Sequence, residues 1–179
     1  MNKKIANVLS KCVQFICRVN APYSVHEMTE ERCEEIINAV QAGDVILLRT
    51  EGELSTMFQP SKWTHSMLVV NQIHCFEAKI TGTRISDMMY ALARCDEAIL
   101  LRPKFLIDVD HLSEYALALV NKPYDFKFES SDAAYYCHEA CCKILAQASG
   151  IEIPKVKTLL GEKWLPDSFL KSGLFTQIL

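Results

Sequence analysis

The chain has 179 residues, of which half are hydrophobic and 23% are charged, and its formal net charge is −3. This length and composition predict a single folded domain with a sizeable core. No run of lysine or arginine forms a basic stripe, so we expect no nucleic-acid partner. The eight cysteines are irregularly spaced, which is atypical of a disulfide framework, and no convincing signal peptide or membrane span is present. These features predict a cytoplasmic protein with free thiols.

The first predicted elements are two amphipathic helices. Residues 5–19 carry hydrophobic side chains at helical spacing, and Thr29 is placed to cap a second helix that ends at Gly43. Packing on the core explains the first helix. The alternative is contact of residues 1–20 with a membrane surface, which the few basic residues disfavour. We therefore expect residues 1–42 to form a helical extension packed on a core of residues 43–179, in one domain overall.

Short β-rich runs and helices alternate in the middle of the chain. Strands are predicted at residues 44–49, 64–70, 73–78 and 98–102, the second and third forming a hairpin, and helices at residues 54–58, 84–93 and 109–121. After Gly150 an irregular tail is expected to lie against the core. This order predicts an α+β fold, in which helices flank a small, mainly antiparallel sheet.

The helix that follows Tyr136 is the most informative element. Its hydrophobic residues recur at intervals of three and four: Cys137, Cys141, Ile144, Leu145 and Ala148. Gly150 is the expected stop, and Ser130, Ser131 or Asp132 the expected cap. Cys137 then lies near unpaired backbone N–H groups, whose partial positive charge favours the reactive thiolate. The alternative is a buried cysteine that only fills the core.

A cysteine nucleophile requires an imidazole base, and five histidines are available. His26 and His111 lie near helix starts among charged residues, where solvent exposure is expected. His138 is the neighbour of Cys137, and neighbours on a helix point about 100° apart, so it is not expected to face the sulfur. The hairpin carries the two remaining candidates.

The register of the hairpin distinguishes His65 from His74. If residues 70–72 form the loop, His65 lies directly opposite Glu77, and such side chains share a face with Cβ atoms roughly 4.5–5.5 Å apart. His74 then falls on the other face. The register therefore favours His65 as base and Glu77 as the carboxylate that orients it. The alternative is a surface His–Glu pair without catalytic importance.

Five short motifs also occur in a characteristic order. They are Gly43-Asp44-Val45-Ile46, Thr64-His65-Ser66, Phe76-Glu77-Ala78 with Gly82 soon after, Tyr124-Asp125-Phe126, and Tyr136-Cys137-x-Glu139. This order resembles the circularly permuted NlpC-like, papain-fold cysteine hydrolases of the YiiX/YebB-like group. The resemblance implies a permuted papain-like core in which Cys137 is the nucleophile, His65 the base and Glu77 the third member, with Tyr124 and Tyr136 lining the substrate pocket.

The chain departs from that family pattern at two places. His138 stands where a small residue usually follows the cysteine, and Ser66-Met67-Leu68 replaces a glycine-containing stretch after the histidine. Both changes are expected to reshape the pocket and leave the triad intact.

The function expected from these residues is hydrolysis of an amide or peptide bond through a thioester, without a metal or other cofactor. The partner is then a peptide, amide or lipid-ester substrate. One alternative is a thioester-forming lipid acyltransferase or esterase of the same fold. Another is a zinc-binding or non-catalytic binding module, for which sulfur and nitrogen donors are available at Cys137, His138, Cys141, Cys142, His74 and Cys75.

Overall fold

A six-stranded antiparallel sheet forms the centre of the computed structural model, which describes residues 28–50, 61–129, 131–158 and 161–179. The strand order is β4-β3-β2-β1-β5-β8. The strands are β1 (Val45–Arg49), β2 (His65–Val69), β3 (His74–Lys79), β4 (Gly82–Asp87), β5 (Glu97–Pro103) and β8 (Phe175–Gln177). The predicted α+β class is confirmed. The helices predicted at residues 5–19 and 54–58 lie outside the described residues.

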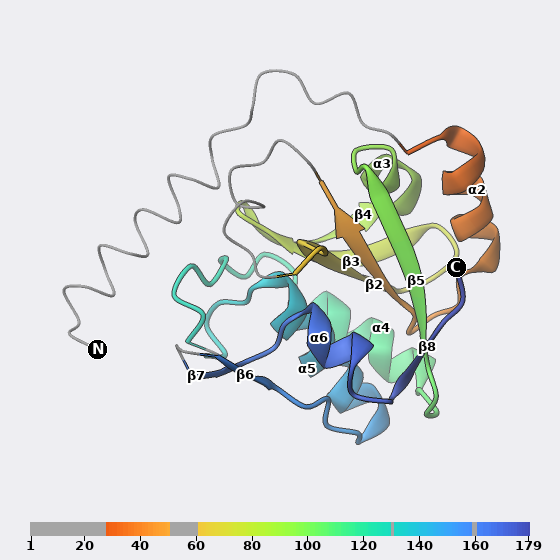
Figure 1. Ribbon diagram of the computed structural model, residues 1–179. Coiled ribbons are helices and arrows are strands. Elements are labelled where there is room, and N and C mark those ends of the chain that lie inside the picture. Colours follow the sequence, from red (N-terminus) through yellow and green to blue (C-terminus); the bar gives the residue numbers. More distant parts are fainter. Residues whose placement is uncertain (1–27, 51–60, 130, 159–160) are drawn as a thin grey trace.

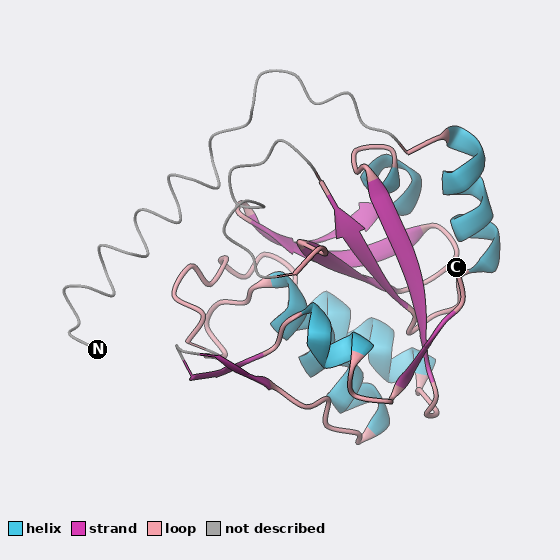
Figure 2. Ribbon diagram, viewed as in Figure 1, coloured by secondary structure: helices cyan, strands magenta, loops and turns pink. Residues whose placement is uncertain are grey.

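Helices cover both faces of this sheet (Figure 1). On one face lie α2 (Glu30–Ala39) and α3 (Met88–Leu92), and on the other lie α4 (Val109–Ala118), α5 (Cys137–Ser149) and α6 (Pro166–Leu170). Figure 2 shows the sheet as the layer between these two groups. Within the described ranges, no helix combines the length and the apolar character that crossing a membrane requires.

The alternation of side chains along β1 explains why its sequence is almost continuously hydrophobic. Val45 and Leu47 belong to the core that includes α4, α5 and α6, whereas Ile46 and Leu48 belong to the core that includes α2 and α3. Successive side chains of a strand point to opposite faces, and here both faces are buried. The central strand therefore needs apolar residues at every position.

The N-terminal capping of α2 is confirmed, and that of α5 is not as predicted. Thr29 caps α2 by accepting a hydrogen bond from the backbone N–H of Arg32. Helix α5 begins at Cys137 after Tyr136, which makes no side-chain capping bond, so Ser131 and Asp132 lie upstream of the helix. Their oxygens accept hydrogen bonds from Lys143 instead.

The predicted helix at residues 84–93 is wrong in its first half. Residues 82–87 form β4, in which Ile85 pairs with Phe76 of β3, and α3 begins only at Met88. Thr83 and Ile85 are β-branched and favour a strand, and the pairing with β3 satisfies the backbone. Asp87 then caps α3 through the N–H of Tyr90.

The C-terminal segment is also more regular than the predicted irregular tail. It contains the two-stranded sheet of β6 (Val156–Thr158) and β7 (Gly161–Lys163), then α6, then the sheet strand β8. Gly150 ends α5 with φ +71°, as predicted. Strands of three residues are too short to produce a recognisable alternation in sequence, so their pairing is decided by the tertiary structure.

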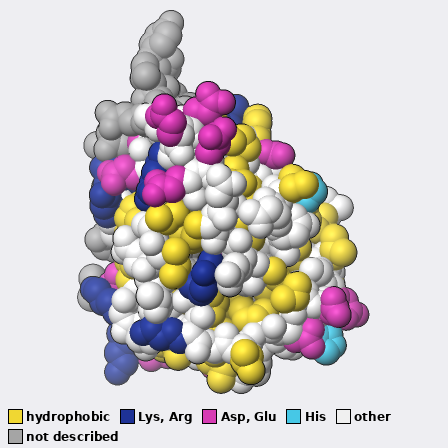
Figure 3. All heavy atoms as spheres, turned by 90° about the vertical axis from the view of Figure 1, so that its right-hand side faces the viewer, with side chains coloured by type: hydrophobic (Ala, Val, Ile, Leu, Met, Phe, Trp, Pro, Cys, Tyr) yellow, Lys and Arg dark blue, Asp and Glu magenta, His cyan; other side chains and the backbone are white. Residues whose placement is uncertain are grey.

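Side chains of both charges are mixed on the face drawn in Figure 3. Acidic side chains gather at the top of this view, whereas lysine and arginine occur in small scattered groups with hydrophobic side chains between them. This face therefore offers no continuous basic surface.

Gly82 provides a test of how tightly β4 meets the loop after α4. Its φ is +113°, and an added Cβ would lie 2.8 Å from the backbone oxygen of Lys122. Gly150 has φ +71° with nothing within 4 Å. We expect Gly150→Ala to cost about 1–2 kcal/mol of unfolding free energy from its backbone conformation alone. Gly82→Ala should cost more than that, because a close backbone contact is added.

Urea denaturation of the two variants measures both costs. Equal destabilisation by the two substitutions would contradict the close approach of Gly82 to Lys122.

Candidate active site

The hairpin brings His65 and Glu77 together, although its register differs from the predicted one. Met67 pairs with Glu77 and Val69 with Cys75, so His65 and Glu77 are diagonal neighbours and not directly opposite. The register is shifted by two residues because the connection between β2 and β3 is longer than predicted. An even shift keeps both side chains on the same face, so the predicted contact survives.

Asn71 explains the longer connection. Its side-chain oxygen accepts hydrogen bonds from the backbone N–H groups of Ile73 and His74, each at 2.9 Å. Asparagine favours such local turns because its side chain replaces backbone partners.

The carboxylate of Glu77 is completely buried and orients His65. His65 Nε2 donates to Glu77 Oε2 at 3.0 Å. The other oxygen accepts from Ser86 Oγ at 2.6 Å and from Arg84 Nη2 at 2.7 Å, and Lys79 Nζ lies 3.5 Å from Oε2. Burial raises the pKa of this carboxyl, but the hydrogen bond and charge of His65, with Lys79 and Ser86, hold that pKa well below its ordinary range. Glu77 is therefore a charged acceptor.

Cys137 is the first residue of α5, and His65 is the first residue of β2. Cys137 and His65 are hydrogen-bonded. Burial lowers the pKa of His65, but its hydrogen bonds with Cys137 and Glu77 outweigh burial and raise that pKa to about 9. The three residues that the sequence singled out thus form a continuous chain, Cys137–His65–Glu77.

His138 is the site residue that sequence reasoning missed. It was expected to point away from Cys137, yet the two side chains are hydrogen-bonded. The reason is tertiary: Ser66 of β2 holds the His138 ring through a 2.9 Å bond to Nδ1. Burial raises the pKa of Cys137, but the charge of His138 and hydrogen bonds with His138 and His65 hold that pKa well below its ordinary range. The sequence did carry one signal for this contact: His138 is a polar residue at the position after the cysteine, where the family usually has a small residue.

The remaining histidines of the described chain lie outside this site. His74 is exposed on β3, on the opposite face from Glu77, and the side chain of His111 is 59% exposed beside Asp108. Both positions agree with the predictions. His26 lies outside the described residues.

The other described cysteines differ from Cys137 in their electrostatic environment. Burial raises the pKa of Cys75 and of Cys95 to about 12, and it also raises the pKa values of Cys141 and Cys142. Cys33 has a raised pKa for the same reason. A thiol with a raised pKa is unreactive at neutral pH. The thiolate-favouring environment is therefore specific to Cys137 within this group.

The two tyrosines implied to line a substrate pocket have different environments. Tyr124 is half-buried, and its ring packs on Phe126 with 4.9 Å between centroids. Tyr136 is buried, and its hydroxyl accepts the backbone N–H of Trp164 at 2.9 Å. This bond ties the start of α5 to the segment after β7, so packing accounts for Tyr136. A substrate contact of Tyr124 stays a prediction.

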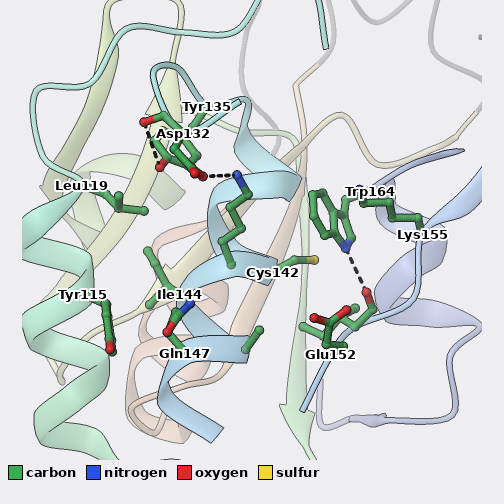
Figure 4. A pocket seen from close by; sticks show the side chains of 13 residues that line it. Tyr115, Leu119, Asp132, Tyr135, Cys142, Ile144, Gln147, Glu152, Lys155 and Trp164 are labelled. Carbon is green, nitrogen blue, oxygen red and sulfur yellow. Dashed lines mark hydrogen bonds and ion pairs between the residues drawn. The ribbon is translucent and has the colours of Figure 1, made fainter. Parts of the chain in front are cut away.

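A pocket of about 490 Å³ lies beside α5, away from the Cys137–His65–Glu77 chain. Figure 4 shows α5 between Tyr115 and Leu119 on one side and Trp164 and Glu152 on the other, with Cys142 directed toward Trp164. None of the three residues of the chain lines it. The pocket and the sulfur of Cys137 are therefore separate features of α5.

A metal site was the alternative use of the cysteines and histidines. Within the described parts of the chain, no group of three or more His, Cys, Asp or Glu side chains is arranged to hold a metal ion. Cys137, His138 and Cys141 thus do not converge as the zinc hypothesis requires.

A cysteine at a helix start, an imidazole at the end of an antiparallel strand and a buried carboxylate behind it define a papain-like cysteine hydrolase. The chain belongs to the family described as permuted papain-like amidase enzyme, YaeF/YiiX, C92 family, which matches residues 39–178. It is therefore an enzyme of the cysteine hydrolase type. No curated protein sequence matches the chain.

The fold is also similar to a solved structure, that of metalloprotein yiiX from Escherichia coli O157:H7. The TM-score is 0.66 with 20% sequence identity, and the match covers 78% of this chain and 96% of that chain. At this identity the likeness establishes the fold, which is the permuted papain-like fold that the sequence motifs predicted.

The lowered pKa of Cys137 predicts a distinctive pH dependence of alkylation. A thiol with a lowered pKa keeps its thiolate as the pH falls, whereas the other described thiols, with raised pKa values, stay neutral. We therefore expect iodoacetamide at about pH 6 to label Cys137 before the five other cysteines that the structure describes, with peptide mapping by mass spectrometry as the measurement.

The same chain unfolded in urea is the control, because unfolding removes the histidines from the sulfur. The alkylation midpoint of Cys137 should then move up to the ordinary range of about 8–9. An unchanged midpoint would contradict the thiolate environment.

Proposed function

We propose that the chain hydrolyses an amide or peptide bond by nucleophilic attack of Cys137, with His65 as base and Glu77 as the residue that orients it. The observation that carries the proposal is the continuous contact of sulfur, imidazole and buried carboxylate. His65 uses Nε2 for Glu77, which leaves Nδ1 for the proton of the thiol.

The first chemical step forms a covalent thioester. Cys137 Sγ adds to the carbonyl carbon of the substrate while His65 holds the proton it received from the thiol. The resulting oxyanion is stabilised at the start of α5, where the backbone N–H of Cys137 is among those without an intrahelical acceptor. His65 then gives its proton to the leaving amine, and the C–N bond breaks.

Water completes the reaction. His65 takes a proton from a water molecule, the resulting hydroxide attacks the thioester carbonyl, and the C–S bond breaks to release a carboxylic acid. Cys137 returns to the thiolate beside a protonated His65, which is the state favoured by the raised pKa of the imidazole. Glu77 stays ionised throughout, because its partners keep its pKa low.

The substrate class follows from this chemistry. A thioester can be formed from an amide, a peptide or an ester, so we propose a peptide or amide substrate, with a lipid ester as the alternative. The solved relative is called a metalloprotein, but the chemistry proposed for this chain uses no metal ion.

Substitution of the three residues tests the proposal with p-nitrophenyl acetate as an activated probe. Cys137→Ala should reduce hydrolysis at least about a thousandfold, because the covalent step is lost. His65→Asn should reduce it about a hundredfold to ten-thousandfold, through loss of the base. Glu77→Gln should have a smaller effect than His65→Asn, because it removes only the orientation and charge of the partner.

Intact-mass spectrometry provides the second readout. The wild-type protein should carry an acetyl group on Cys137 during turnover, and His74→Asn, a substitution of the exposed first residue of β3, should behave as wild type. Full hydrolysis by Cys137→Ala, with its fold verified by circular dichroism, would refute the assignment.

A further inference from the structure

His138 occupies a position that its neighbours define closely. It is the second residue of α5, it is 3% exposed, and its Nδ1 is bound to Ser66 Oγ at 2.9 Å. Phe169 of α6 packs edge-on against the ring, with 6.3 Å between centroids. A ring held by a hydrogen bond on one side and an aromatic contact on another has little rotational freedom.

Ser66 connects this ring to a second point on α5. Its hydroxyl is fully buried and is also hydrogen-bonded to Cys141 Sγ at 3.5 Å. Ser66 has the same strand parity as Leu68, which packs in the core that includes α5, so the Ser66 side chain points to the α5 face of the sheet. One strand thus supplies His65 to the sulfur of Cys137 and, through Ser66, also fixes the orientation of His138.

The charged groups around the sulfur of Cys137 come from three elements. His65 comes from β2, with Glu77 of β3 behind it, and His138 comes from α5 itself. Glu139, Cys141 and Cys142 are further titratable groups in the first turns of α5, and burial raises the pKa of each of them. Two imidazoles, from two different elements, therefore interact with the sulfur.

The two imidazoles differ in their own partners. His65 is backed by a carboxylate, whereas His138 is backed by an uncharged hydroxyl and an aromatic ring. A carboxylate stabilises the imidazolium that a base becomes after it takes a proton, and a hydroxyl does so less. This difference suits His65 to proton transfer and His138 to holding the sulfur.

We propose that His138 is a second histidine partner of the Cys137 sulfur, positioned by Ser66, and that the thiolate is maintained by both imidazoles jointly. The inference rests on the proposed function, in which Cys137 is the nucleophile. Its consequence is that the sulfur is a thiolate before the substrate is attacked and again after the thioester is hydrolysed, because two imidazoles contact it in the free enzyme.

The test is the pH midpoint of Cys137 alkylation by iodoacetamide, which does not require a substrate. His138→Asn keeps an amide that can bond to Ser66 but removes the imidazole, and it should raise the midpoint by about one pH unit, a tenfold change in the thiolate-to-thiol ratio. Ser66→Ala should raise it by less, since the ring remains. His65→Asn should also raise it, and the double variant His65→Asn/His138→Asn should exceed either one.

His74→Asn is the matched control, because it removes an exposed imidazole from the same hairpin and should leave the midpoint unchanged. A folded His138→Asn with the wild-type midpoint would overturn the inference. If His138→Asn does not fold, Ser66→Ala decides, and a wild-type midpoint in that variant overturns it.

The same variants separate this inference from the proposed function. If the proposed function is wrong, hydrolysis of p-nitrophenyl acetate does not depend on Cys137, whatever the pH midpoints of Cys137 alkylation are. Failure of the inference alone appears as Cys137-dependent hydrolysis with a midpoint that responds to His65→Asn and not to His138→Asn.

Discussion

The buried carboxylate of Glu77 is the constraint on which the site depends. An ionised carboxylate without exposed surface is stable only when charged and hydrogen-bonding partners surround it. Those partners come from three adjacent strands: His65 from β2, Lys79 from β3, and Arg84 and Ser86 from β4. The sheet therefore has to be assembled in one register before this charge is satisfied. The same bonds fix the imidazole that faces the sulfur, so the requirement for stability and the requirement for chemistry coincide.

The second constraint is the place where α5 begins. Because the helix starts at Cys137, this residue stands at the positive end of α5, where the backbone N–H groups have no intrahelical partner. The hydroxyl of Tyr136 and the backbone of Trp164 tie this end to the C-terminal segment, and α6 supplies Phe169 against His138. The segment predicted to be an irregular tail thus supports the start of α5, with Cys137, from one side, while β2 supports it from the other.

The two departures from the family pattern that the sequence revealed are in contact with each other. His138 follows the cysteine where a small residue is usual, and Ser66 follows His65 in place of a glycine-containing stretch, and their side chains are 2.9 Å apart. Ser66 therefore provides a hydrogen-bond partner for His138, and the imidazole of His138 interacts with the sulfur of Cys137. The 490 Å³ pocket beside α5 lies apart from this network.

The sequence by itself determined the α+β class, most of the strands, and the contacts among Cys137, His65 and Glu77. Each has a local signature: a hydrophobic stripe at helical spacing, β-rich runs, and strand parity, which an even shift of register leaves unchanged. Only the tertiary structure decided the true register, the strand at residues 82–87 and the short C-terminal strands, because Asn71 and neighbouring strands select backbone pairings that leave little pattern in sequence. It also decided the orientation of His138. Helical geometry alone turns that ring away from Cys137, and a hydroxyl 72 positions earlier in the chain holds it beside the sulfur.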